Sequence, residues 1–127
     1  MSSSSETPPS PVLSPSLSVD VVTHGSEQAV MCVGGELDVA TAMLLQHHLA
    51  TQLGQGRRHL VIDLAEVPFM DSSGLNIILR AMNETRATGG SLRLAAPAPP
   101  VRRVLELTGV TLTIPVHGTV EQALAHS

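Results

Sequence analysis

The residues best suited to chemistry stand together in the segment Met70-Asp71-Ser72-Ser73-Gly74-Leu75. Two adjacent hydroxyls follow a carboxylate where a short apolar run gives way to apolar residues at helical spacing, so both serines fall in the connection or in the first helical turn. Backbone N–H groups there lack intrahelical partners, and the helix dipole favours negative charge. The segment is therefore suited to carry a phosphate on Ser72 or Ser73.

Phosphorylation of this segment is expected to weaken the binding of a protein partner. A phosphate adds about −1.5 to −2 charge units beside Asp71, and a partner surface fitted to a neutral hydroxyl would then face like-charge and desolvation penalties. A loss of about 3–5 kcal/mol lowers affinity by about two to four decades. We expect Gly74 to let the partner approach, because it has no side chain.

The same residues also have a purely structural interpretation. Serine is a preferred helix N-cap, and on spacing alone Ser72 and Ser73 are more often caps than modification sites. On structure alone, the Asp71 carboxylate is as often only a negative charge that the helix dipole stabilises at the helix N-terminus as it is a functional group. The two interpretations are compatible, because an N-cap can also border an interface.

The elements that must position this segment begin with a hairpin. Alternating apolar residues over 17–21 and an apolar run over 29–33 flank the turn-forming stretch His24-Gly25-Ser26-Glu27. Asp38 then has the residue type and position of an N-cap for an amphipathic helix that runs through Leu53.

The second half of the chain alternates strands and helices. The apolar run His59–Leu64 predicts a central strand, and apolar residues at helical spacing over 75–82 predict a helix that ends at Gly89-Gly90 before a strand over 91–95. Such a strand, helix and strand in succession imply a parallel pair.

The remaining residues add three more elements. We expect a helix from Pro99-Pro100 to Gly109, a strand over Thr111–Pro115 and a last helix opened by Gly118 or Thr119. The fold class is therefore α/β, with a mixed β-sheet of about four to five strands packed with about four helices.

Length and composition favour one domain. The chain has 127 residues, and its first 15 are dominated by serine and proline, so we expect a disordered tail over 1–15 and a folded domain over 16–127. The Ser/Pro-rich start lacks the pattern of a secretory signal and no apolar run approaches membrane-spanning length, which predicts a cytoplasmic protein without a membrane contact. Cys32 is expected to be a small buried hydrophobe.

Charge and side-chain types exclude several functions. The net charge is −4 and the seven basic residues are all arginines, so no basic stripe is available for nucleic acid. The histidines are scattered apart from the pair His47-His48, which predicts no metal site. Arg102 and Arg103 beside Glu106 are typical of a solvated helix face.

The sequence resembles the STAS-domain family of bacterial anti-sigma factor antagonists, most closely its soluble single-domain members. The similarity runs from about Leu17 to the C-terminus, in five motifs that stand in the family's order: Gly35-Glu36-Leu37-Asp38, Val61-Ile62-Asp63-Leu64, Phe69-Met70-Asp71-Ser72-Ser73-Gly74-Leu75, Gly89-Gly90-Ser91-Leu92 and Val101-Arg102-Arg103-Val104-Leu105-Glu106-Leu107-Thr108-Gly109. The resemblance implies the STAS fold. Asn76 departs from the family, in which Gly or another small residue is common at this position.

The resemblance also implies a mechanism. In similar proteins the serine directly after the aspartate, here Ser72, is phosphorylated by an anti-sigma factor that is itself an ATP-binding serine kinase. The unmodified protein captures that kinase and frees a sigma factor, and a serine phosphatase resets the switch. The chain is then a substrate and not an enzyme, it needs no cofactor, and we expect a monomer. The implied partner-binding residues are Asp38, Asp71, Ser72, Ser73, Gly74 and Asn76.

Two rival functions remain. A serine hydrolase is disfavoured, because Asp71-Ser72-Ser73-Gly74 is not the Gly-x-Ser-x-Gly elbow and no histidine has an obvious triad role. A STAS protein that does not switch, acting as a scaffold in a stress-signalling assembly or beside a membrane transporter, is the nearer alternative. The identity of the kinase, the sigma factor and the phosphatase, and the choice between Ser72 and Ser73, stay open at this level.

Overall fold

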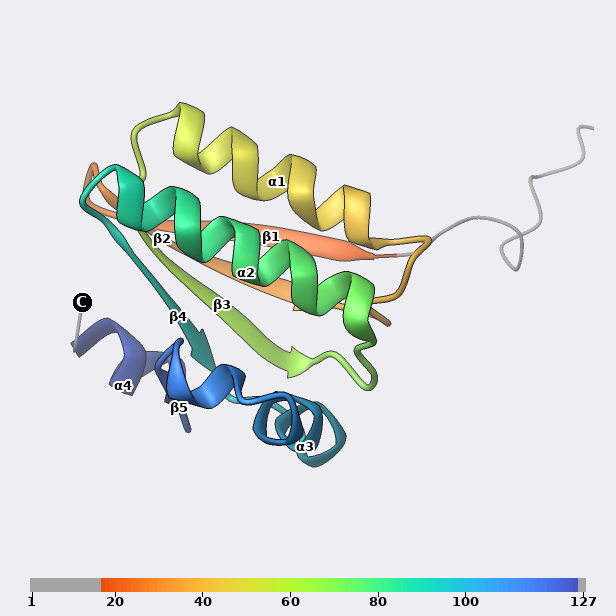
Figure 1. Cartoon of the computed structure of the whole chain (residues 1–127). Coiled ribbons are helices and arrows are strands. Elements are labelled where there is room, and N and C mark those ends of the chain that lie inside the picture. Colours follow the sequence, from red (N-terminus) through yellow and green to blue (C-terminus); the bar gives the residue numbers. More distant parts are fainter. Residues whose placement is uncertain (1–16, 126–127) are drawn as a thin grey trace, which may run out of the picture.

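The computed structural model describes residues 17–125. In this part of the chain two strands are followed by helices and strands in alternation (Figure 1): β1 (Ser18–His24), β2 (Gln28–Gly34), α1 (Ala42–Gly54), β3 (His59–Glu66), α2 (Ser72–Ala87), β4 (Ser91–Ala95), α3 (Pro99–Leu107), the 3-10 helix η2 (Val110–Leu112), β5 (Val116–His117) and α4 (Val120–Ala125). The predicted α/β fold is confirmed. The tail predicted over 1–15 lies outside the described residues.

The sheet has the order β1-β2-β3-β4-β5. β1 pairs antiparallel with β2, and every other neighbouring pair is parallel, so the predicted mixed sheet is confirmed. β3 lies in the middle, as predicted, and Val61 and Ile62, which point to opposite faces, are both fully buried. The carboxyl ends of β2, β3 and β4 meet at one edge, where the loops into α1, α2 and α3 begin.

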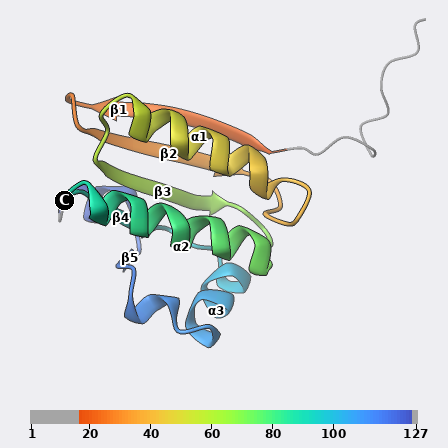
Figure 2. The same ribbon diagram turned by 45° about the horizontal axis from the view of Figure 1, so that its top comes forward.

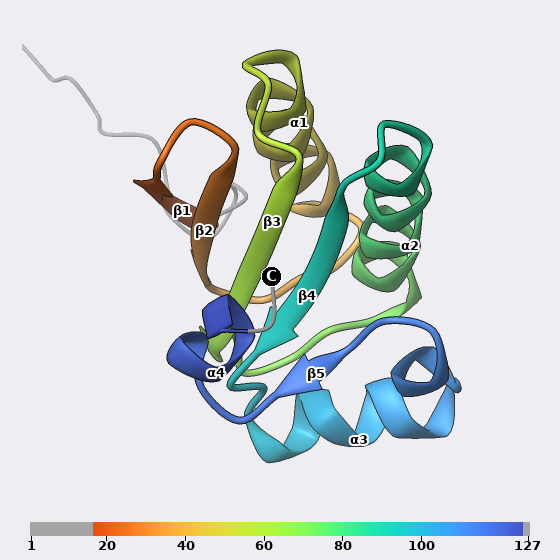
Figure 3. The same ribbon diagram turned by 90° about the vertical axis from the view of Figure 1, so that its left-hand side faces the viewer.

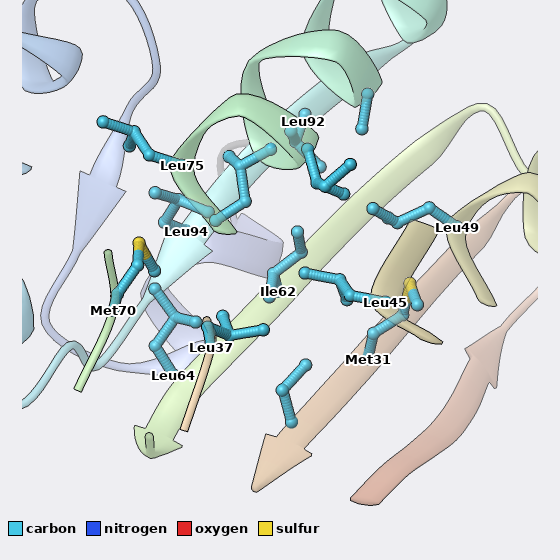
Figure 4. Packing of buried hydrophobic residues seen from close by; sticks show 14 of the residues in the cluster. Met31, Leu37, Leu45, Leu49, Ile62, Leu64, Met70, Leu75, Leu92 and Leu94 are labelled. Carbon is cyan, nitrogen blue, oxygen red and sulfur yellow. The ribbon is translucent and has the colours of Figure 1, made fainter. Parts of the chain in front are cut away.

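One face of the sheet carries the main core. α1 and α2 lie side by side across this face (Figure 2), and their apolar stripes meet the inward side chains of the strands. The core is aliphatic, with Met31, Leu45, Ile62 and Ile78 fully buried. Figure 4 shows this packing, with Leu37, Leu64 and Met70 close together at the carboxyl end of β3. The position of α2 is thus fixed by burial along its length.

The opposite face is covered mainly by α4. Ala123 packs there with Val30, Val61 and Ala95 in a smaller apolar cluster, and Figure 3 shows α4 in front of β3 and β4. The expectation that Cys32 is buried is wrong, because α4 does not cover the β1 side of this face and the thiol is only partly shielded. Partial burial and the nearby carboxylates of Asp63 and Asp20 raise the pKa of the Cys32 thiol, so it stays protonated at neutral pH.

The strand predicted over Thr111–Pro115 is also wrong. Val110 and Ile114 are the buried residues of this stretch, and their spacing of four is helical; the amide of Ile114 donates to the carbonyl of Val110 at 2.9 Å. Pro115 has no N–H, and only its carbonyl joins the sheet, accepting from the amide of Leu94 at 2.9 Å. The last strand is therefore the short β5, which pairs with β4.

Candidate functional site

Two loops are joined at the carboxyl edge of the sheet. The amide of Leu37 donates to the carbonyl of Phe69 at 2.9 Å, and the amide of Asp71 donates to the carbonyl of Leu37 at 2.9 Å. Leu37 and Met70 thus form an isolated parallel bridge beyond the ends of β2 and β3. This bridge brings Asp38, the residue after Leu37, to the start of α2.

Asp71 is the N-cap of α2. Its backbone is extended, its Oδ1 accepts from the amide of Ser73 at 2.8 Å, and its carbonyl accepts from the amide of Leu75 at 3.1 Å. Ser72 is the first helical residue and is exposed, whereas Ser73 is half-buried. The interpretation of the serines as caps is therefore wrong, because the preceding carboxylate takes that role and leaves Ser72 facing solvent.

The cap can be tested by two substitutions at position 71. Asp71→Ala removes the acceptor for the Ser73 amide, and we expect it to lower the free energy of unfolding by about 1 kcal/mol. Asp71→Asn keeps an acceptor of the same shape and should retain most of that stability. Urea unfolding followed by circular dichroism measures both variants. Equal losses would contradict the capping role of the side chain.

Gly74 has a different role from the one expected. It is buried, and a Cβ at this position would lie 2.9 Å from the Cβ of Leu37 and 3.3 Å from the Leu37 carbonyl oxygen. The missing side chain therefore makes room for the loop after β2 of the same chain. Glycine at this position lets the two loops approach closely enough to hydrogen-bond.

Asp38 does not cap α1, contrary to the sequence prediction. Its Oδ1 accepts from the amides of Ala40 at 3.0 Å and Thr41 at 3.2 Å, which forms a turn before the helix. Thr41 is the N-cap residue, and α1 begins at Ala42. An Asp side chain readily satisfies amides two and three residues onward, so it closes the turn before the helix instead of the helix itself.

Exposed apolar side chains flank this site, and the sequence reasoning missed them. Val39 is 77% exposed in the loop after Asp38, Met43 is 66% exposed in the first turn of α1, and Phe69 is 47% exposed just before α2. We call Val39, Met43 and Phe69 the apolar rim. One signal was available, because Phe69 is the single aromatic residue of the chain and stands in a loop next to the serine motif.

The sequence also predicted Asn76 at this site. Asn76 is exposed on α2, one helical turn after Ser72, so both belong to the same helix face. No group of three or more histidine, cysteine, aspartate or glutamate side chains suited to a metal ion occurs within residues 17–125. No helix in the described part of the chain has the length and apolar character needed to cross a membrane. The start of α2 thus presents an exposed serine hydroxyl, and exposed apolar side chains stand in the adjoining loops.

Two similar proteins are anti-sigma factor antagonists by name. The anti-sigma-F factor antagonist RsfB of Mycobacterium tuberculosis is 33% identical over 109 residues, which cover 86% of this chain and 88% of RsfB. The anti-sigma factor antagonist of Mycobacterium paratuberculosis, known from a crystal structure, is 32% identical with a TM-score of 0.79, and the match covers 87% of this chain and 93% of that one.

A third similar protein has been solved in two states. The Bacillus anti-sigma factor antagonist SpoIIAA is 26% identical in its unphosphorylated form, with a TM-score of 0.75 and coverage of 86% of this chain and 95% of SpoIIAA. Its phosphorylated form is 25% identical, with a TM-score of 0.68 and coverage of 86% and 98%. The sequence also matches the STAS domain family over residues 18–123, from the first strand into the last helix. The protein is therefore a member of the STAS domain family.

Proposed function

We propose that this protein is an anti-sigma factor antagonist whose binding is switched by phosphorylation of Ser72. The unmodified form binds an anti-sigma factor that is also an ATP-binding serine kinase, and so releases a sigma factor. The observation that carries this proposal is the exposed Ser72 hydroxyl at the start of α2, bordered by Asp38, the Asp71 cap and the apolar rim. The names of the relatives and the two solved states of SpoIIAA support it.

Ser72 is a better phosphate acceptor than Ser73 for a structural reason. The Ser73 side chain is half-buried and its amide is held by Asp71, whereas Ser72 is exposed. A kinase must place the hydroxyl in line with the γ-phosphate of ATP, which requires access from solvent. A phosphate on Ser72 would also lie at the positive end of α2, so modification leaves the domain folded.

The apolar rim supplies the binding surface of the unmodified form. In a typical interface a few large buried side chains contribute most of the affinity, and neighbouring polar groups contribute specificity. Phe69 and Met43 are the large side chains of the apolar rim. We assign the polar part to Asp38, Asp71, Ser73 and Asn76 around Ser72. A phosphate at the centre of this surface would bring a double negative charge into a region that must lose water on binding.

The chain itself is a substrate and not a catalyst in this scheme. The kinase supplies ATP and the transfer machinery, and a separate serine phosphatase restores the free hydroxyl. No cofactor is needed, and one copy of the domain presents the complete surface, in line with a monomer. We place this cycle in the cytoplasm, where a sigma factor and its regulators meet.

Phosphorylation is tested directly by mass spectrometry. Wild-type protein is incubated with ATP and each purified ATP-binding anti-sigma factor kinase of the source organism, and the modified peptide is sequenced. We expect one phosphate on Ser72, none in Ser72→Ala, and unchanged incorporation in the matched control Ser73→Ala. Phosphate retained by Ser72→Ala but lost from Ser73→Ala would move the site by one residue. No incorporation with kinases shown to be active would favour a scaffold that does not switch.

A further inference from the structure

Thr41 combines deep burial with several hydrogen bonds inside the loop after β2. The residue is 4% exposed. Its Oγ1 donates to the carbonyl of Glu36 at 2.7 Å and accepts from the amide of Asp38 at 3.0 Å. The Asp38 carboxylate lies 3.3 Å from the same hydroxyl. One side chain thus ties both ends of the turn that carries Asp38.

Backbone hydrogen bonds connect this turn to the residues just before α2. Leu37 lies between the two backbone groups that the Thr41 hydroxyl holds, and Leu37 makes the hydrogen bonds to Phe69 and Asp71. Loss of the hydroxyl would leave the carbonyl of Glu36 and the amide of Asp38 without this partner in a partly buried loop. Such groups gain from water contact, so the loop would tend to open away from α2.

We propose that Thr41 is a positioning residue for partner recognition: its hydroxyl holds the loop after β2 in the conformation that sets Asp38 beside the start of α2. Thr41 does not touch the partner, because its side chain is buried. It acts through the backbone at Leu37 and Asp38. The part of this proposal that concerns partner binding rests on the proposed function, whereas the effect on the loop does not.

Three variants separate positioning from simple loss of stability. Thr41→Val keeps the shape and removes the hydroxyl, and Thr41→Ser keeps the hydroxyl. Thr85→Val is the matched control, because Thr85 is also buried and donates its hydroxyl to a backbone carbonyl, that of Met82 at 2.9 Å. Thr85 lies near the far end of α2, away from both loops.

Amide hydrogen exchange of the full chain tests the loop without a partner. We expect Thr41→Val to speed exchange of the Leu37 and Asp71 amides by about tenfold more than Thr85→Val does, because their hydrogen bonds depend on the loop. Thr41→Ser should restore slow exchange. Equal exchange at these two amides in Thr41→Val and Thr85→Val, at comparable melting temperatures, overturns the proposal.

Calorimetric titration with the anti-sigma factor kinase that binds the wild type tests the consequence. We expect about tenfold weaker binding for Thr41→Val, and values within about threefold of wild type for Thr41→Ser and Thr85→Val. Wild-type affinity in Thr41→Val overturns the role in recognition. If wild-type protein binds none of the purified kinases, the proposed function fails, and hydrogen exchange alone decides whether Thr41 positions the loop.

Discussion

Ser72→Asp is expected to weaken binding to the anti-sigma factor kinase by about two to four orders of magnitude while the domain stays folded. The side chain at this position is exposed at the centre of the proposed binding surface. A carboxylate there must lose its water on binding, and Asp71 already supplies a negative group next to it. The fold tolerates the charge, because an acidic residue in the first turn of a helix is favourable by about 0.3–1 kcal/mol.

Ser72→Asn is the matched control for this experiment. Asparagine has nearly the size and shape of aspartate and carries no charge, so it separates electrostatic repulsion from crowding. We expect Ser72→Asn to bind the kinase much more tightly than Ser72→Asp, and Ser72→Ala to bind like wild type. Calorimetric titration gives the affinities, and thermal unfolding checks that each variant is folded. Equal losses for the aspartate and asparagine variants would contradict a switch based on charge.

Gly90→Ala is expected to cause a large loss of stability. Gly90 joins α2 to β4, and a Cβ at this position would overlap the backbone carbonyl oxygen of Arg58. That carbonyl accepts from the amide of Ser91 at 2.9 Å, at the point where β3 and β4 begin to pair. Backbone must move to make room, so we expect a loss of more than about 3 kcal/mol in the free energy of unfolding.

Gly54→Ala provides the control for Gly90→Ala. Gly54 is the last residue of α1, and a Cβ there would meet no atom within 4 Å. Alanine is the better helix former, so this variant should be as stable as wild type or slightly more stable. Urea unfolding of the two variants side by side measures the difference. A loss below about 1 kcal/mol for Gly90→Ala would contradict this prediction, because the backbone at the start of β4 would then shift at little cost.

Local patterns in the sequence predicted most of the architecture. The nearly continuous apolar run of β3 predicted a central strand, and Leu60, Val61, Ile62 and Leu64 are buried there because both faces of the strand are covered. The helical spacing of Leu75, Ile78 and Met82 identified α2, whose core side chains share one face. The residues of the 70–75 motif marked the exposed serine through their resemblance to the STAS family. Each of these signals is contained within a short window of the chain.

The predictions that failed depended on competition between neighbouring groups. Asp71 and Ser72 are both of a residue type that suits an N-cap. Asp71 is the N-cap because its backbone is extended and α2 begins at Ser72, which local composition does not specify. Asp38 likewise closes a turn, and α1 starts only after Thr41. In the stretch after α3, the same branched residues that favour a strand also fit the helical spacing of Val110 and Ile114. The helical turn forms here, and it buries both Val110 and Ile114.

The arrangement of the site required the tertiary structure, because it depends on contacts between residues far apart in sequence. The bridge between Leu37 and Met70 joins two loops that lie side by side because β2 and β3 pair in parallel. Gly74 appeared from its sequence to leave space for a partner, but the packing of α2 gives that space to Leu37. Side-chain types and their periodicity thus determine most of the elements and where a modifiable serine stands. Which residues surround that serine is decided by the packing of the sheet and helices, because burial and hydrogen bonding are satisfied over the whole domain at once.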